Sequence, residues 1–176
     1  LHYLIDGSVK VLIDDEDRRE LVIAYINKGE FIGEMGLFVP QTTRSVVIRT
    51  RTRCQVGEIT YQRLLLLFET ELKEHAKDIL FAVGRQLSSR LHQTSRKVGH
   101  LAFLDVTGRI AGALLDLTKQ PDAMTHPDGM QIRVTRQELG RIVGCSREMA
   151  GRVLKALEEQ GLIDVKGKTI VVRGTR

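Results

Sequence analysis

The stretch TRQELGRIVGCSREMAGRVLK, residues 135–155, carries the signals of two short helices joined by a tight turn. Thr135 and Glu138 are spaced as a capping box, in which a hydroxyl and a carboxylate satisfy free backbone N–H groups at a helix start. Gly144 suits the positive backbone angle of a turn, and Ser146 is a good cap for a second helix. The apolar contacts between the helices are expected from Leu139, Val143, Cys145, Ala150 and Val153. The pattern predicts a helix-turn-helix, and the alternative is an ordinary helical hairpin.

Three charged residues share one side of the second predicted helix. At 100° per residue, Arg147, Glu148 and Arg152 lie at roughly 0°, 100° and 140° around its axis. An Arg can donate two hydrogen bonds to the O6 and N7 edge of guanine, and a Glu can accept one from the amino group of cytosine. This face is therefore predicted to read G and C in DNA, unless the three side chains form only a surface network.

Two strands at 162–165 and 168–172 follow, joined as a hairpin that forms a wing. Basic and polar side chains on the wing and near the helix starts can contact phosphates, which positions a protein on DNA without reading its sequence. The predicted phosphate contacts are Arg136, Gln137, Ser146, Lys166 and Lys168.

The distribution of charge favours the same interpretation. Residues 1–130 hold 17 basic and 17 acidic side chains, whereas residues 131–176 hold 10 basic and 5 acidic ones, so the whole net charge of +5 lies in the last quarter. Clustered Lys and Arg bind phosphate backbones through counterion release. A solvated basic surface is the alternative that charge alone leaves open.

The first part of the chain reads as short strands rich in Val, Ile and Tyr, separated by glycines or polar clusters. The expected strands are 1–5, 8–13, 20–26, 45–49 and 54–59. They predict an antiparallel sandwich or barrel. The sequence starts at Leu1 without an initiator Met, and we expect earlier strands of this domain to be missing from it.

From Tyr61 to about Phe103 the composition favours helix, with no Pro and many Leu, Lys, Glu, Gln and Arg. Apolar residues three, four or seven apart form a seam on it, with Thr94 at one polar step: Leu80, Val83, Leu87, Leu91, Val98 and Leu101. A near-heptad seam predicts pairing with a second copy of the chain, that is, a homodimer. The alternative is a helix packed on its own sheet.

A further amphipathic helix is expected at 104–117, then a polar loop at 119–128 and a strand at 130–134. We divide the chain into a sandwich at 1–72, a dimerisation helix and hinge at 73–104, and a winged helix-turn-helix domain at 105–176. The expected fold class is therefore α+β.

Other classes of protein fit poorly. The longest apolar run, Leu64–Phe68, is far below the roughly 20 residues of a membrane-spanning helix, so we expect no membrane segment. Two cysteines are too few for a disulfide framework or a four-ligand zinc site, which favours a reducing cytoplasm and no metal. The five histidines show no paired metal spacing, and no nucleophile–base arrangement is evident, so an enzyme is disfavoured and no catalytic residue is expected.

A ligand site is predicted between two strands. Gly33, Glu34 and Met35 precede Arg44 and Ser45, which places glycine amides, one acid and one cation close in sequence. Glycine amides and a forked guanidinium suit phosphate oxygens, and a Glu can accept from sugar hydroxyls. Phosphate plus ribose is the chemistry implied, although a turn with an incidental Glu and Arg gives the same pattern.

At this point the sequence resembles the cyclic AMP receptor protein family, within the CRP/FNR transcription regulators. Besides residues 135–155, the segments that carry the resemblance are GSVKVLI (7–13), FIGEMGLF (31–38), TSRKVGHLAFLDVTGRI (94–110), KQPDAMTHPDGMQI (119–132), GKTIVV (167–172) and GTR (174–176). It implies a cyclic nucleotide-binding jelly roll, a long dimer helix and a C-terminal winged helix-turn-helix.

The resemblance also implies roles for single residues. Gly33 and Glu34 would line the ribose of cyclic AMP, and Arg44 and Ser45 would hold its phosphate. Thr94 of one protomer and Ser95 of its partner would contact adenine. Residues 147, 148 and 152 match base readers, and Thr107 joins residues 136, 146 and 168 as a phosphate contact or its neighbour.

The loop at 123–128 resembles one that touches RNA polymerase, at the C-terminal domain of its α subunit; the loop residues are Ala123, Met124, Thr125, His126, Pro127 and Asp128. Met149 departs from the family, which has a hydroxyl there. We thus expect a cyclic AMP-dependent homodimer, mainly an activator, that binds palindromic promoter sites. The alternative is a regulator of the same fold that responds to another nucleotide or to no ligand.

Overall fold

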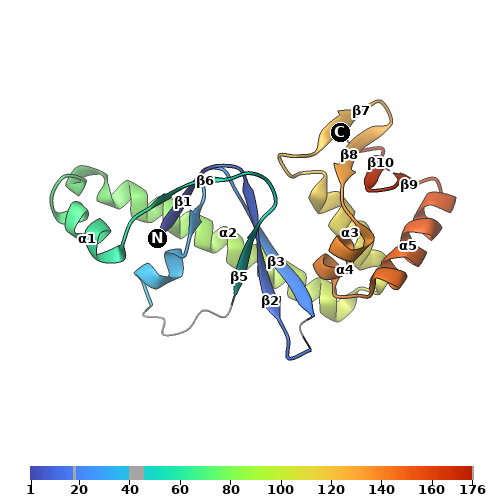
Figure 1. The fold of residues 1–176 in the computed structure, drawn as a ribbon, viewed down its shortest axis with the longest axis horizontal. Helices are drawn as coiled ribbons and strands as arrows, with labels where there is room; N and C mark the ends of the chain where they lie inside the picture. The colour runs from blue at the N-terminus through green and yellow to red at the C-terminus, as the bar shows by residue number, and fades with distance from the viewer. Residues whose placement is uncertain (18, 40–45, 176) are drawn as a thin grey trace. The chain divides into compact units, whose positions relative to one another are not determined.

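The computed structural model describes residues 1–17, 19–39 and 46–175. The chain divides into two compact units: Leu1–Asp15 with Val22–Arg96, and Glu16–Leu21 with Lys97–Arg176. Figure 1 shows the strands of the N-terminal part in blue and teal and the C-terminal helices and strands in yellow to red. Each unit is built around its own buried residues.

The first unit contains two three-stranded sheets. Their strands are β1 (His2–Asp6), β2 (Ser8–Asp14), β3 (Glu20–Asn27), β4 (Phe31–Ile32), β5 (Val47–Thr50) and β6 (Gln55–Glu58). The order is β4-β1-β6 in one sheet and β3-β2-β5 in the other, and β1 pairs antiparallel with both of its neighbours. Leu4, Val9, Ile26 and Ile32 form a buried cluster. The predicted sandwich of short antiparallel strands is confirmed.

Two elements of this unit were not predicted from the pattern. The strand β4 is only two residues long, and the short 3-10 helix η1 (Glu34–Leu37) follows it directly. Elements of this length are too short to show a hydrophobic period. They form the segment on which the expected ligand residues lie.

The expected helix from Tyr61 to Phe103 is interrupted. It consists of α1 (Tyr61–Glu69), the 3-10 turn η2 (Lys73–His75) and α2 (Ala76–Phe103). At the break, the Thr70 hydroxyl donates to the Leu66 carbonyl at 2.9 Å, a local bond that competes with helix continuation. The result is a separate helix α2 of 28 residues.

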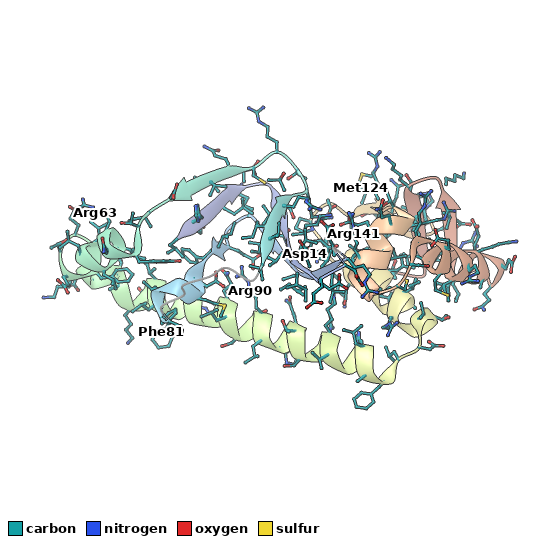
Figure 2. All side chains as sticks on the ribbon, turned by 60° about the horizontal axis from the view of Figure 1, so that its bottom comes forward. Asp14, Arg63, Phe81, Arg90, Met124 and Arg141 are labelled. Atoms are coloured by element: carbon teal, nitrogen blue, oxygen red, sulfur yellow. The ribbon has the colours of Figure 1, made fainter. Side chains whose placement is uncertain are left out.

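The two sides of α2 differ in burial. Val83 is fully buried within this chain, so it does not belong to an outward seam. Figure 2 shows Arg90 on the side of α2 that faces the strands and Phe81 on the opposite side. The outward seam instead follows a strict three-four spacing through Phe81, Gly84, Ser88, Leu91, Ser95, Val98 and Ala102.

The second unit contains α3 (Val106–Leu117), α4 (Arg136–Val143), α5 (Arg147–Glu159) and a four-stranded sheet. The sheet has the order β7-β8-β10-β9, from β7 (Met124–His126), β8 (Gly129–Arg133), β9 (Ile163–Lys166) and β10 (Thr169–Arg173). All three helices contribute fully or nearly fully buried residues to the core, among them Ile110, Leu114, Leu139, Ala150, Leu154 and Leu157.

The loop expected at 119–128 contains a strand. Met124–His126 form β7, which pairs antiparallel with β8. Met124 and Thr125 are exposed, so no alternation of buried and exposed residues signals this strand in the sequence. Within the described ranges, no helix has both the length and the apolar character needed to cross a membrane.

Candidate functional site

The segment after β4 presents a buried carboxylate. Gly33 has φ 82° and ψ 15°, in the left-handed region that favours glycine, and it precedes the first residue of η1. The Glu34 that follows is only 3% exposed. Its carboxylate forms an ion pair with the guanidinium of Arg90 on α2. A buried carboxylate needs such a partner, because desolvation of an unpaired charge is costly.

Arg90 and Gln86 attach α2 to the backbone of β4. Arg90 Nη2 donates to the Phe31 carbonyl at 2.8 Å. The Gln86 amide accepts from the Phe31 N–H at 2.7 Å and donates to the same carbonyl at 2.8 Å. Arg90 Nε is buried and has no hydrogen-bond partner among the residues that the structure describes. Figure 2 shows Arg90 reaching from α2 toward this strand.

Tyr61 covers the segment from the side of α1. Its hydroxyl donates to the Gly33 carbonyl at 2.6 Å. A Cβ at Gly36 would lie 2.4 Å from that hydroxyl oxygen, so only glycine fits beneath the ring. Met35 between them is 54% exposed. Two helices therefore fix the backbone of a segment that keeps an exposed surface of its own.

The remaining expected ligand residues fall into two groups. Arg44 and Ser45 lie outside the described residues. Thr94 and Ser95 are exposed on α2, and Thr94 stands one helical turn after Arg90. Gly33, Glu34, Arg90 and Thr94 thus belong to one unit, in which residues 90 and 94 share a side of α2.

The predicted helix-turn-helix is present in the second unit. The Thr135 hydroxyl accepts from the Glu138 N–H at 3.0 Å at the start of α4. Gly144 ends α4 with φ 70°, and the Ser146 hydroxyl accepts from the Met149 N–H at 3.2 Å at the start of α5. A Cβ at Gly140 would lie 2.6 Å from the Cys145 carbonyl oxygen, so the close turn requires glycine there.

The expected base-reading side chains are all exposed at the start of α5. Arg147, Glu148 and Arg152 lie within its first two turns. Hydrogen bonds from the Glu148 backbone N–H and the Ser146 side chain hold the pKa of Glu148 below its usual value, and the two arginines add to this effect. Glu148 is therefore an acceptor at neutral pH, as a contact to a cytosine amino group requires.

Two further contacts organise this surface. A Cβ built at Gly151 on α5 would lie 3.4 Å from Cδ of Arg136, so the Arg136 side chain lies across α5 at this point. Arg152 Nη2 lies 3.8 Å from the sulfur of Met149 and donates to it. Gln137 is exposed beside Arg136, and Thr107 is exposed in the first turn of α3.

The wing carries two exposed lysines. Lys166 ends β9 and Lys168 precedes β10, on either side of Gly167 with φ 65°. At the other end of the two strands, Arg173 donates to both carboxylate oxygens of Asp164, at 2.7 and 2.8 Å. This pairing holds the pKa of Asp164 below its ordinary value.

The hairpin of β7 and β8 displays residues 123–128. Met124 is 49% exposed, and Figure 2 shows it on the surface. His126 Nδ1 accepts from the Asp128 N–H at 3.3 Å and lies 3.7 Å from the Asp128 carboxylate. Backbone pairing with β8 gives this surface a defined shape.

Sequence reasoning missed Gln86, Arg90 and Tyr61. The signal for the first two was present: polar residues at 86, 90 and 94, four apart, interrupt a helix whose neighbouring positions are apolar. Tyr61 offered no such signal, because its role depends on the close approach of α1 to Gly36.

The matches to known families agree with this architecture. Residues 1–71 match the cyclic nucleotide-binding domain, and residues 108–175 match the Crp-like helix-turn-helix domain. The class defined by the fold and site is thus a transcription regulator that combines a nucleotide-binding β domain with a DNA-binding domain. It is not an enzyme.

The chain belongs to the CRP/FNR family. It is 57% identical over 176 residues to CRP-like protein Clp of Xanthomonas oryzae pv. oryzae, covering all of this chain and 76% of the relative. It is equally similar to the solved c-di-GMP responsive global regulator CLP of Xanthomonas campestris, with a TM-score of 0.92 over 99% of this chain and 84% of that one. A CRP/FNR regulator from Thermus thermophilus is 23% identical and shares the fold, with a TM-score of 0.80 over 97% and 81% of the two chains.

Proposed function

We propose that this chain is a nucleotide-gated, sequence-specific DNA-binding regulator that acts as a homodimer on palindromic promoter sites, mainly as an activator. The observation that carries the proposal is the Glu34–Arg90 ion pair, which links the expected ribose site directly to α2. A ligand shifts a conformational equilibrium only through different affinities for the two states. Contacts on both the loop and the helix provide such a difference.

Cyclic AMP is the proposed ligand. Glu34 accepts from a ribose hydroxyl, the backbone at Gly33 approaches the sugar, and Thr94 with the partner's Ser95 contacts the adenine. Arg44 and Ser45 hold the phosphate. The described residues fit the sugar end of such a nucleotide, since they supply a buried carboxylate beside a glycine turn.

A second candidate ligand is c-di-GMP. It is favoured by the name of the Xanthomonas campestris regulator, which is called c-di-GMP responsive and shares 57% of its residues with this chain. Both ligands present ribose hydroxyls and phosphodiester oxygens, so Glu34 suits either one. The difference between them is the number of bases and phosphates, which residues at Arg44, Ser45, Thr94 and Ser95 must accommodate.

The two ligands are separated by calorimetry on the full chain. We expect cyclic AMP to bind with a measurable heat and Glu34→Gln to weaken that binding. The exposed Glu58→Gln on β6 is the matched control and leaves it unchanged. Binding of c-di-GMP alone, again weakened by Glu34→Gln, identifies the second candidate. Binding of neither nucleotide contradicts the proposed ligand class.

The homodimer is proposed from the outward seam of α2. Leu91, Phe81 and Val98 are 69%, 59% and 59% exposed in the isolated chain. Beside Phe81 lies a surface hollow of about 550 Å³, lined by Leu80, Phe81, Gly84, Arg85 and Ser88. Small residues between large ones at heptad spacing favour the close packing of a second α2.

The seam has a direct test. Phe81→Glu places a charge in the proposed interface, so we expect a monomer by sedimentation. Phe103→Glu changes a residue that is 88% exposed and off the seam, and we expect it to stay dimeric. A dimer that persists in Phe81→Glu argues against this surface.

DNA is read by Arg147, Glu148 and Arg152, while Arg136, Gln137, Ser146, Lys166, Lys168 and Thr107 contact phosphates. Two recognition helices related by the dimer axis fit half-sites one helical turn apart. The surface at 123–128 is proposed to contact RNA polymerase, at the C-terminal domain of its α subunit. Such a regulator works in the bacterial cytoplasm, where promoters lie.

A further inference from the structure

We propose that Gln86 is a positioning residue that makes the nucleotide segment and α2 move together, and so sets how strongly ligand binding changes DNA affinity. This inference rests on the proposed function. It concerns a residue that contacts neither the expected ligand nor DNA. What it contacts is the peptide backbone of Phe31, two residues before Gly33.

The geometry of the contact is complete at both ends. Gln86 Oε1 accepts from the Phe31 N–H at 2.7 Å, and Gln86 Nε2 donates to the Phe31 carbonyl at 2.8 Å. The carbonyl of the preceding residue, Glu30, accepts from the Leu4 N–H of β1 at 2.9 Å. Because successive residues of a strand point their backbone groups to opposite edges, Phe31 presents its own N–H and carbonyl away from β1.

β4 is the end strand of its sheet, so its outer edge has no neighbouring strand among the described residues. Backbone groups at such an edge need partners, and Gln86 supplies both a donor and an acceptor there. A side-chain amide carries the two functions side by side, as a peptide does. Glutamate has two acceptors when ionised, and methionine has neither function in comparable strength.

One helical turn later, Arg90 extends the same grip to the ligand segment. It donates to the Phe31 carbonyl at 2.8 Å and pairs with the Glu34 carboxylate. Gln86 and Arg90 therefore hold one peptide from one side of α2, and only Arg90 reaches the proposed ribose site. Loss of Gln86 leaves the Phe31 N–H without its acceptor, while the Glu34–Arg90 pair keeps both of its members.

The consequence is specific to coupling between sites. Pairing of Phe31 with Tyr3 and of Ile32 with His2 keeps β4 in the sheet without Gln86. The sheet and the seam of α2 are then preserved, but β4 can shift relative to α2 when ligand binds. Ligand binding energy is then spent on moving β4 and no longer reaches the helix.

The test measures the affinity for a palindromic duplex with and without saturating nucleotide, in wild type, Gln86→Met and Gln93→Met. Gln93 lies on the same helix seven residues later and is exposed, so it is the matched control. The nucleotide is cyclic AMP, with c-di-GMP in a parallel arm. We expect Gln86→Met to bind the duplex without nucleotide as wild type does, and to lose roughly fivefold or more of the nucleotide-induced change, within the usual range of coupling.

The outcomes separate cleanly. If Gln86→Met retains the full nucleotide-induced change, the inference is wrong while the proposed function stands. If wild type responds to neither nucleotide, the proposed function fails, and the inference fails with it. If Gln86→Met does not fold, hydrogen exchange on wild type decides: the amides of 31–34 and of 84–92 must gain protection together when the nucleotide binds, and separate behaviour contradicts the inference.

Discussion

The side chain of Arg136 in α4 lies across Gly151 in α5, with Cδ 3.4 Å and Nε 3.5 Å from the point where a Cβ would stand. Arg136 is an expected phosphate contact, and Gly151 is a helical residue with no φ requirement for glycine. The glycine therefore provides room. An alanine methyl would make ordinary contact here, whereas a branched side chain would displace the arginine.

This relationship predicts a graded series at position 151. Gly151→Ala keeps DNA affinity and stabilises the protein by up to about 1 kcal/mol, because alanine is the better helix former. Gly151→Val displaces Arg136, so the slope of log affinity against log salt falls by about 0.9 for one lost phosphate contact. Arg136→Ala alone should match this loss, and the double variant should add nothing to it. A full second loss in the double variant would separate the two residues.

Arg90→Met should destabilise the fold. It leaves the Glu34 carboxylate buried without its partner, and breaking a buried pair in this way costs about 3–5 kcal/mol. The double variant Glu34→Gln with Arg90→Met removes the unpaired charge and should recover much of the stability, but not nucleotide affinity. Urea unfolding and calorimetry measure the two quantities. Equal stability of Arg90→Met and wild type would show that the pair contributes little.

The two kinds of DNA contact should respond differently to truncation. Arg147→Ala should cost about 1–3 kcal/mol at one G·C pair and relax the preference there, while Lys168→Ala should weaken all sequences alike and lower the salt slope by about 1. A binding-site selection and salt titrations distinguish these effects. An unchanged sequence preference in Arg147→Ala would refute its assignment as a base reader.

Lys97 predicts a dependence of stability on alkaline pH. Burial lowers its pKa from 10.5 to about 8, although Asp116 acts in the opposite direction. Between these values the unfolded chain binds more protons than the folded one, so the free energy of unfolding rises with pH across this window and is flat below it. Lys97→Met should remove that rise in urea titrations from about pH 7 to about pH 10. A rise of the same size in the variant would assign it to another group.

Much of the fold follows from local signals in the sequence. The helix-turn-helix is predicted because Thr135, Gly144 and Ser146 are each required by one specific backbone geometry, and the structure contains all three caps. The short antiparallel strands follow from alternation and turn residues. These features depend on near neighbours in the chain, so the sequence displays them directly.

The missed features depend on contacts between distant residues. Val83 has the spacing of a dimer seam but packs within its own chain, because helix periodicity does not say which neighbour covers which side. Gln86 finds Phe31 only after β4 and α2 have packed, 55 positions apart in sequence. The strand β7 is formed by backbone pairing with β8, which exposed side chains do not reveal.

The most direct test of the account is the affinity for a labelled palindromic duplex, measured by fluorescence anisotropy with and without saturating cyclic AMP or c-di-GMP. If nucleotide bound at Glu34 controls the arrangement of α2, one of the nucleotides must change the affinity by at least about fivefold, the lower end of typical coupling. Glu34→Gln must reduce that change. The same dissociation constant under all three conditions would contradict nucleotide gating.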